Sequence, residues 1–315
     1  MTSRPGAPEA TIVITTKDRR DDLEAALGTA VRQTARCEIL VIDDGSTDGT
    51  AEMVREHFPG VRVERSERSL GLIAQRTRAA GLARAPVIVS IDDDARFTSD
   101  RTVEQTLADF DHPRIGAVAI PFLDVRTTTR VLQEPPDQED RWVSSSYIGT
   151  AHALRRDVFL GLGGYREGLG QMVEEPDLCL RMLEAGHVVR LGRAERINHL
   201  ESPKRQQPVI AALGRRNDLL HGWHNVPMPY LPIRIAKIAG YSAIYPEARR
   251  HPGAVIRGLA AGFGAMWRHR RQRRPVSPGT YRLDHELRRN GPLPLDAIES
   301  RLRPLNSPGA PPEPR

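Results

Sequence analysis

The sequence predicts an α/β fold with a doubly wound, mostly parallel sheet, followed by a helical C-terminal extension. The first observation is an alternation, over about the first hundred residues, of short apolar runs with segments of helical period. The second is that acidic residues follow the ends of several of these runs. Strand–helix–strand crossovers make neighbouring strands parallel, and ligands of such sheets bind beyond the carboxyl ends of the strands.

The expected elements follow in chain order. We expect strands over 11–16, 38–43, 61–64 and 87–91, separated by helices over 21–33, 51–58 and 71–82. Beyond residue 100 the alternation weakens, and we expect a helix over 100–110, strands over 115–122, 125–132, 146–154 and 188–191, and helices starting near 157 and 174. The last segments, 207–223, 233–244 and 254–267, have helical character.

The stretch from Val87 to Asp94 organises the rest of the chain. Its first five residues include four β-branched apolar residues, which predicts a buried strand, and it ends in three consecutive carboxylates. Because side chains alternate along extended chain, Asp92 and Asp94 project to one side and Asp93 to the other. Like charges about 4 Å apart repel by roughly 4 kcal/mol at an effective dielectric of 20. The cluster indicates a divalent metal site, and the alternative is a loop in which aspartates make turns and cap a helix.

The composition limits the classes of protein to which this chain can belong. The chain has 315 residues, 39% of them hydrophobic and 27% charged, and its mean hydropathy of −0.44 is typical of a soluble protein. It contains no apolar run of about 18 residues and no N-terminal signal pattern. Cys37 and Cys179 are isolated, which favours buried thiols in a reducing cytoplasm over a disulfide or a metal pair. We therefore expect a cytoplasmic protein, with a peripheral position at the inner face of the membrane as a variant.

The net charge of +6 is unevenly distributed, because the C-terminal part carries the basic runs 249–250 and 268–274. Such runs face anionic lipid, nucleic acid or phosphorylated substrates. The runs have little aromatic interleaving and no nucleic-acid fold motif, so we do not expect a nucleic-acid partner. The apolar residues of the preceding segment 254–267 either touch a membrane peripherally or pack on the rest of the chain.

Four ordered blocks resemble the family-2 inverting glycosyltransferases. The first two are IVITTKDR at 12–19 and VIDDGSTD at 41–48. The third is GLIAQRT at 71–77, which leads to IDDD at 91–94 and is similar to the family's DXD element. The fourth is GGY at 163–165 followed by EEPDLCLR at 174–181. The resemblance runs from Thr11 to about His199.

The resemblance implies the fold of nucleotide-diphosphate-sugar transferases, known as GT-A. We expect a catalytic domain over 11–225, with a nucleotide-binding half at about 11–115 and an acceptor half at about 116–225. A helical basic extension would cover 226–303. Residues 1–10 and the proline-rich residues 304–315 would be flexible or disordered tails.

Carried over by position, the resemblance implies a set of nucleotide-binding residues. Thr15 and Asp44 would meet the nucleobase, with Asp44 accepting from a ring N–H of uracil or thymine. Asp93 or Asp92 would lie near the ribose. Arg76 belongs to the same set, although the residue after it is threonine where the family often has asparagine.

The resemblance also implies a metal site and a catalytic base. Asp94, and with it His199, would hold Mg²⁺ or Mn²⁺ at the diphosphate, where negative charge develops on the leaving group. Glu175 aligns with the general base that takes a proton from the acceptor hydroxyl, although the family usually has an aspartate there. Glu174 and Asp177 would lie on the acceptor side.

The function that follows is a non-processive, inverting transfer of one hexosyl or deoxyhexosyl unit. The donor would be linked to UDP, dTDP or GDP, and the acceptor would be a glycan, a lipid-linked sugar or a small molecule. The pattern Gln-x-x-Arg-Trp at 138–142 matches processive synthases, but there it follows the catalytic acid, so we interpret this match as chance. A sugar-phosphate nucleotidyltransferase is an alternative, although residues 15–18 lack the glycines of its phosphate loop, and a non-catalytic membrane or nucleic-acid adaptor is another.

Overall fold

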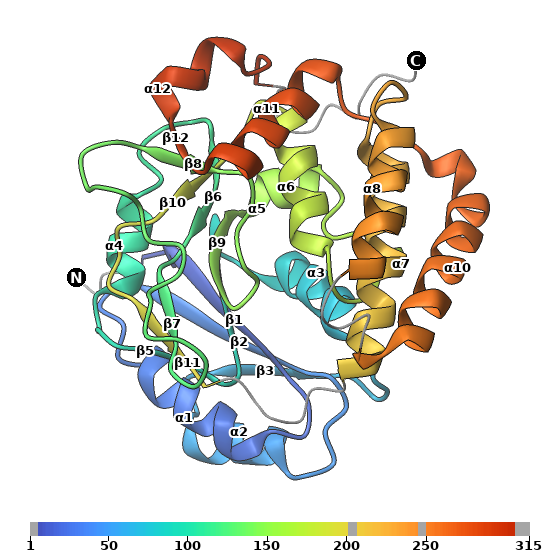
Figure 1. The fold of residues 1–315 in the computed structure, drawn as a ribbon. Coiled ribbons are helices and arrows are strands. Elements are labelled where there is room, and N and C mark those ends of the chain that lie inside the picture. The colour runs from blue at the N-terminus through green and yellow to red at the C-terminus, as the bar shows by residue number, and fades with distance from the viewer. Residues whose placement is uncertain (1–5, 201–206, 245–249, 306–315) are drawn as a thin grey trace.

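The structure, a computed structural model, describes residues 6–200, 207–244 and 250–305. Its main sheet has nine strands in the order β12–β8–β10–β6–β9–β4–β1–β2–β3, and all but β8 and β9 run in one direction (Figure 1). The strands are β1 (Ala10–Thr16), β2 (Cys37–Asp43), β3 (Arg62–Arg65), β4 (Val87–Asp92), β6 (Ile115–Ala119), β8 (Trp142–Ser144), β9 (Ala151–Arg155), β10 (Val188–Leu191) and β12 (Leu293–Pro294). The predicted α/β fold with a mostly parallel sheet is confirmed.

The strand order creates a switch point between β1 and β4. The chain passes from β1 outward to β2 and β3 and then returns to β4 on the other side of β1. In the parallel register Thr15 of β1 lies opposite Asp92 of β4, and Thr16 lies opposite Asp43 of β2. The carboxyl ends of three strands therefore meet at one edge of the sheet, where ligands of doubly wound folds bind.

Helices cover both faces of the sheet, as the alternation of side chains along β1 requires. Ile12 and Ile14 pack on one face with α1 (Arg20–Ala30), α2 (Thr50–His57) and α4 (Thr102–Ala108). Val13 packs on the other face with α3 (Leu72–Leu82), α5 (Arg156–Gly161) and α6 (Glu174–Glu184). Each fully buried aliphatic side chain stabilises the fold by about 1.5–3 kcal/mol. The two layers hold the strand ends in a fixed frame.

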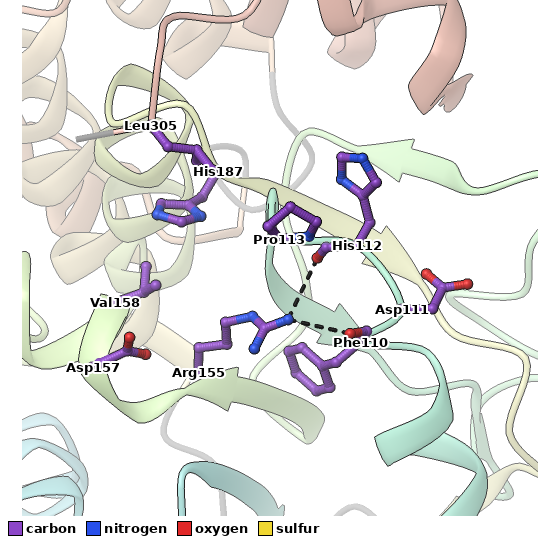
Figure 2. A pocket seen from close by; sticks show the side chains of 9 residues that line it. All are labelled: Phe110, Asp111, His112, Pro113, Arg155, Asp157, Val158, His187 and Leu305. Atoms are coloured by element: carbon purple, nitrogen blue, oxygen red, sulfur yellow. Dashed lines mark hydrogen bonds between the residues drawn. The ribbon is translucent and has the colours of Figure 1, made fainter. Parts of the chain in front are cut away.

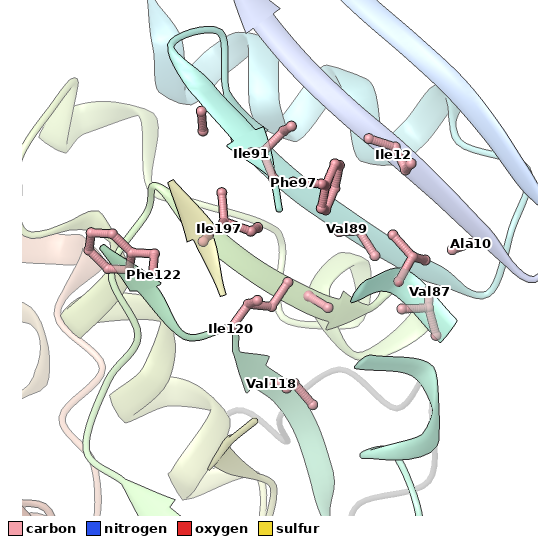
Figure 3. Close-up of a cluster of buried hydrophobic side chains, with 14 of the residues drawn as sticks. Ala10, Ile12, Val87, Val89, Ile91, Phe97, Val118, Ile120, Phe122 and Ile197 are labelled. Atoms are coloured by element: carbon pink, nitrogen blue, oxygen red, sulfur yellow. The ribbon is translucent and has the colours of Figure 1, made fainter. Parts of the chain in front are cut away.

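A second, three-stranded sheet lies beside the end of β4. It consists of β5 (Ala95–Phe97), β11 (Ile197–His199) and β7 (Phe122–Asp124), with β11 in the middle. Its apolar side chains Phe97, Phe122 and Ile197 join Val89 and Ile91 of β4 in one cluster, which Figure 3 shows. This packing brings the end of β11 next to the end of β4.

Several predicted elements differ from the structure. The strand expected over 115–122 divides into β6, which ends at Ala119, and the start of β7 in the second sheet. The strand expected over 125–132 is wrong: β7 ends at Asp124, whose carboxylate accepts from the Arg126 N–H and whose carbonyl accepts from the Thr128 N–H, so the chain turns. The strand expected over 146–154 begins only at Ala151. The helix near Asp157 begins at Arg156 and has no side-chain cap.

The C-terminal part is helical, as predicted, but it also returns to the main sheet. Its helices are α7 (Gln207–Asn225), α8 (Leu231–Ile244), α10 (Pro252–Arg268), α11 (Pro278–Asn290) and α12 (Leu295–Ile298), with 3₁₀ turns at Arg270–Gln272 and Glu299–Arg301. Strand β12 pairs with β8, and Leu283, Leu287 and Leu295 join the main core. Residues 1–5 and 306–315 of the predicted tails, and Arg249 of the first basic run, lie outside the described residues.

None of the described helices is long and apolar enough to cross a membrane.

Helix α10 packs on α7 through its smallest residues. The residues it buries are Ala254, Val255, Gly258, Gly262 and Ala265. A Cβ added at Gly258 would lie 2.4 Å from the Ala212 carbonyl oxygen, and one at Gly262 would lie 2.7 Å from Leu219 Cδ1. Glycine at these two positions lets the helices approach more closely than any larger residue would allow.

We predict that Gly258→Ala destabilises the protein by about 1–3 kcal/mol, because the new methyl group meets backbone and forces the helices apart. Gly264→Ala in the same helix is the matched control. The only atom near its added Cβ is Arg268 Nη1 at 3.8 Å, so it gains about 0.5–1 kcal/mol of helix propensity. Denaturant midpoints of the two variants measure the difference. Equal midpoints would contradict the close packing.

Candidate active site

Two aspartates and a histidine converge beyond the end of β4. Asp92 ends that strand, Asp94 follows it, and His199 ends β11. The His199 Nε2 atom lies 3.3 Å from Asp94 Oδ1 and 4.0 Å from Asp92 Oδ2. One potential ligand atom from each residue falls within 4.8 Å of the others. Among the described residues, this group can hold a metal ion.

A third carboxylate orients the histidine. Strands β11 and β7 run parallel with His199 opposite Asp124, and Asp124 Oδ2 lies 3.4 Å from His199 Nδ1. The imidazole thus stands between two carboxylates, with Nε2 facing Asp94. In metal sites a carboxylate on the outer ring nitrogen fixes the tautomer and orientation of the ligand histidine. Sequence reasoning missed Asp124, because it lies at the edge of a segment that we predicted to be a strand.

The chemistry of these donors fits a divalent cation. Carboxylate oxygens suit Mg²⁺ and Mn²⁺, and the neutral imidazole of histidine is a common ligand of transition metals. Burial opposes charge on the ring, but the hydrogen bond and charge of Asp94 raise the pKa of His199. Burial would raise the pKa of Asp94, yet His199 and Arg19 lower it to about 2. Below its raised pKa, His199 supplies positive charge beside Asp94, and binding of a cation through the ring would require loss of that proton.

Asp93 faces away from this group, as strand alternation predicts. It accepts a hydrogen bond from Thr16 Oγ1 at 2.8 Å. Arg19 Nη1 lies 2.6 Å from Asp93 Oδ1 and 2.9 Å from Asp94 Oδ2, so one guanidinium bridges the two aspartates. Burial nevertheless raises the pKa of Asp93 to about 6. Arg19 belongs to the first sequence block, but its contact with the aspartates was not predicted.

Arg76 connects the aspartates to a pair of glutamates. This side chain of α3 is buried, and its Nη2 donates to Asp92 Oδ1 at 2.6 Å and to the Gly149 carbonyl at 3.0 Å. Burial opposes its charge, but Asp92 and the acidic groups around it, which include Glu174 and Glu175, raise the pKa of Arg76. One buried cation therefore serves both acidic clusters.

The two glutamates open α6 and share one environment. Glu174 is 3% exposed, and its Oε2 has no hydrogen-bond partner among the described residues. Burial and the charge of Glu175 raise the pKa of Glu174 to about 8. Burial also raises the pKa of Glu175, while Arg76 opposes the shift. Because burial opposes charge on both carboxyl groups, ionisation of Glu175 makes ionisation of Glu174 less favourable.

Glu175 lies directly against the main chain at Gly149. A Cβ added at Gly149 would lie 2.3 Å from Glu175 Oε1, so a larger residue there would displace the Glu175 carboxyl group. Behind Gly149, burial holds the pKa of His152 well below its ordinary value, so the ring is neutral. His152 Nδ1 donates to the Gly149 carbonyl at 3.1 Å, and its Nε2 lies 3.3 Å from the Tyr165 hydroxyl. This buried network fixes the loop on which Glu175 rests, and the sequence offered no signal for it.

The segment that leads into α6 is strained. Met172 and Val173 both have φ of 72°, in the left-handed region that a β-branched residue such as valine rarely adopts. The buried amide of Asn217, on α7, holds this segment. Its Nδ2 lies 2.7 Å from the Leu169 carbonyl, 2.7 Å from the Gln171 carbonyl and 2.9 Å from the Met172 carbonyl. Helix α7 thus helps to set where α6 begins, and with it the positions of Glu174 and Glu175. Sequence reasoning missed this contact.

Thr15 and Asp44 lie at the ends of the neighbouring strands. Thr15 Oγ1 is buried and has no hydrogen-bond partner among the described residues. The Asp44 carboxylate accepts from the Ser69 hydroxyl, the Leu70 and Gly71 N–H groups and the Gln75 amide, at 2.6–3.0 Å. Burial opposes them, yet these bonds lower the pKa of Asp44. Asp44 therefore organises the loop before α3, and its contact with a nucleobase stays a prediction.

Asp177 is bound by two arginines and an asparagine. It is fully buried, and its carboxylate lies 2.8 Å from Arg181 Nε, 3.1 Å from Arg166 Nε and 2.6 Å from Asn225 Nδ2. Burial opposes ionisation, but His221 and the two arginines hold the pKa of Asp177 well below its ordinary range. The residue ties α6 to α7, and any influence on an acceptor is transmitted through α6.

A cavity of about 480 Å³ lies elsewhere in the molecule (Figure 2). It is bordered by Arg155, which pairs with Val87 at the opposite end of β4 from Asp92. The Arg155 guanidinium is occupied by the carbonyls of Phe110, His112 and Ile115. The cavity is thus separate from the convergent acidic groups.

The chain is similar to known proteins in both sequence and fold. Residues 11–163 match the family described as Glycosyl transferase family 2. The succinoglycan biosynthesis protein ExoU of Rhizobium meliloti is 33% identical over 93 residues, which cover 29% of this chain and 27% of that protein. A validoxylamine A glucosyltransferase of Streptomyces hygroscopicus subsp. jinggangensis is 35% identical over 98 residues, covering 28% and 23%. The solved mannosyltransferase PcManGT from Pyrobaculum calidifontis, in complex with GDP-Man and Mn²⁺, has a TM-score of 0.57 at 19% identity, covering 88% of this chain and 79% of that one.

Residues 11–163, just under half of the chain, are similar to glycosyl transferase family 2, and the fold of the chain is GT-A. This confirms the family that the four sequence blocks indicated. The chain matches only about a quarter of the length of the two curated relatives named above.

We predict that Mn²⁺ raises the melting temperature of the protein and that Asp94→Asn abolishes this rise, because the residue supplies a central oxygen ligand. Asp124→Asn should weaken the apparent metal affinity by about 10- to 100-fold through loss of the histidine orientation. Asp100→Asn, at an exposed surface ion pair, is the control. Thermal-shift titrations measure all three. A full Mn²⁺ response in Asp94→Asn would disprove the metal group.

Proposed function

We propose that this protein transfers one sugar from a nucleotide-diphosphate-sugar donor to an acceptor hydroxyl, with inversion and with the help of a divalent cation. The observation that carries this proposal is the position of Arg76 between two acidic groups. On one side lie Asp92, Asp94 and His199, and on the other lie Glu174 and Glu175. A cation-binding group and a candidate base thus share one site at the carboxyl ends of β1 and β4.

The donor would bind along the strand ends. The unpartnered Thr15 hydroxyl is placed to take a hydrogen bond from a nucleotide, and Asp92 or Asp93 would meet the ribose. Asp94 and His199 would hold Mg²⁺ or Mn²⁺ beside the diphosphate. When bound, the cation neutralises the charge that develops on the leaving diphosphate. The solved mannosyltransferase contains GDP-Man and Mn²⁺, which supports this class of donor, with UDP and dTDP as the other candidates.

Glu175 would act as the general base. Its raised pKa suits proton removal from a hydroxyl near neutral pH, since efficiency is greatest when the pKa lies near the working pH. Arg76 and the main chain at Gly149 hold the carboxylate in place. Direct attack by the deprotonated hydroxyl on the anomeric carbon, opposite the leaving diphosphate, inverts the configuration.

Transfer of a single sugar is supported by the position of the Gln-x-x-Arg-Trp pattern at 138–142. Arg141 pairs with Asp111, and the Trp142 ring N–H donates to Asp137, so neither side chain reaches the acidic site. The relatives named above include a glucosyltransferase and a polysaccharide biosynthesis protein, which suggests a small-molecule, glycan or lipid-linked acceptor. The family match favours this reading over a nucleotidyltransferase and over a non-catalytic adaptor.

We predict that Glu175→Gln lowers kcat by about 10²–10⁴-fold and leaves nucleotide affinity nearly unchanged, because only proton transfer is lost. Asp94→Ala should instead abolish metal-dependent donor binding, and Asp44→Ala should weaken nucleotide binding by releasing its loop. Turnover of a panel of donors, followed by mass spectrometry, gives kcat, and calorimetry with nucleoside diphosphates gives affinity. An equal loss of affinity and turnover in Glu175→Gln would assign that residue a structural role.

We predict that activity falls as the pH drops through the raised pKa of Glu175, because the base must be ionised. Glu174 has a pKa of about 8 and is neutral over the acidic limb, so Glu174→Gln, which keeps that position uncharged, should leave the limb in place. Glu167→Gln, on the neighbouring loop, serves as the control. The comparison is made on kcat across the pH range. A clear shift of the limb in Glu174→Gln, in either direction, would contradict the assignment of the higher pKa to Glu174.

A further inference from the structure

Helix α10 presents its large apolar side chains to solvent. Its buried face consists of small residues and Val255, which the packing on α7 demands. The large residues Ile256, Phe263 and Trp267 are 66%, 50% and 69% exposed. With the exposed Ala260 they follow one another at intervals of four, three and four, so they form one stripe along the helix. A surface helix normally buries such residues, and here the arrangement is inverted.

The stripe is bordered by cations without acidic partners. Arg257 and Arg268 lie on one flank of the helix, and Arg270 and Arg271 follow at its C-terminal end. Within the described part of the chain, none of these four guanidinium groups forms an ion pair. Arg270 stacks on the ring of Trp267, with its guanidinium carbon 4.6 Å from the ring centroid. Between Leu219 and Leu283 the sequence contains a single carboxylate, Glu247.

We propose that this face of α10, consisting of Ile256, Phe263, Trp267 and the four arginines, docks on an anionic lipid bilayer. Helices that lie in the membrane interface combine an aromatic and aliphatic face with lysine or arginine, and the cations are attracted to anionic headgroups. A nucleic acid would satisfy the arginines but would leave the aliphatic stripe in water. The charge and the apolar stripe together therefore favour lipid.

The docking face is connected to the acceptor side of the proposed active site through α7. One side of α7 receives α10 at Ala212 and Leu219. On the same helix, Asn217 holds the carbonyls of the strained segment before Glu174, and Arg216 Nη2 donates to the Gly168 carbonyl at 2.8 Å. Lipid binding by itself does not rest on the proposed transferase activity, but it would place the glutamate pair near an acceptor carried in the membrane.

The test is co-sedimentation of the full chain with vesicles, without nucleotide or donor. We expect binding to phosphatidylcholine vesicles that contain about one third phosphatidylglycerol, little binding to pure phosphatidylcholine, and loss of most binding when the ionic strength rises well above about 0.1 M. The emission of Trp267, the exposed tryptophan, should shift to the blue on binding. Trp267→Phe should remove that shift.

Two triple variants and a matched control separate the contribution of the apolar side chains from that of the arginines. Ile256→Ser/Phe263→Ser/Trp267→Ser and Arg268→Gln/Arg270→Gln/Arg271→Gln should each lower the partition coefficient at least about tenfold. Arg32→Gln/Arg55→Gln/Arg101→Gln changes the net charge equally, at surface ion pairs elsewhere, and should bind like the native chain. Melting curves confirm that each variant is folded.

Three results would overturn the proposal. The native chain could fail to bind anionic vesicles at low salt. The control triple could lose as much binding as the α10 arginine triple, which would reduce the effect to net charge. Sedimentation equilibrium could show a dimer that the serine triple dissociates, with no vesicle binding, which would make this face an interface between copies of the chain.

Discussion

The compensation of buried negative charge at the end of β4 is the constraint on which the site depends. Three consecutive carboxylates, Asp92 to Asp94, stand at the end of this buried strand. Like charges about 4 Å apart repel by roughly 4 kcal/mol at an effective dielectric of 20. The structure answers with three cations from distant parts of the chain: Arg19 after β1, Arg76 from α3 and His199 from β11. Each is at most about one-quarter exposed, so removing one would leave a poorly solvated charge. The three-stranded sheet positions His199, and helix α3 positions Arg76.

The acidic groups at α6 and the segment before them carry features that oppose stability. Glu174 is buried beside the half-buried Glu175, and the segment before them holds valine in a left-handed conformation. Both features cost free energy, and both persist because surrounding groups hold them, Arg76 on one side and Asn217 on the other. A carboxylate with a raised pKa on a rigid support is what a base near neutral pH requires.

The C-terminal helices are part of this support. Strand β12 and the leucines of α11 and α12 close the edge of the main sheet, and α7 reaches the segment before α6. Helix α10 approaches α7 closely through Gly258 and Gly262, and this close approach turns its aromatic residues outward. The close packing of α10 on α7 thus both supports the helix that holds the segment before α6 and creates the exposed apolar and basic face.

Local pattern determined much of this protein. The β-branched runs, the periodicity of the first helices and the acidic residues at strand ends predicted the mostly parallel sheet and the carboxylates at its edge, because each signal lies within a few residues. The local pattern gave a wrong prediction at 125–132, where residues of high strand propensity follow Asp124. The Asp124 side chain accepts a hydrogen bond from the Arg126 N–H and turns the chain, and strand propensity does not include such a bond. The local pattern also could not foresee Asp124 behind His199, Gly149 against Glu175 or Asn217 beneath Val173. These contacts join residues from about 25 to 75 positions apart, and only the packing of separate elements brings such residues within hydrogen-bond distance.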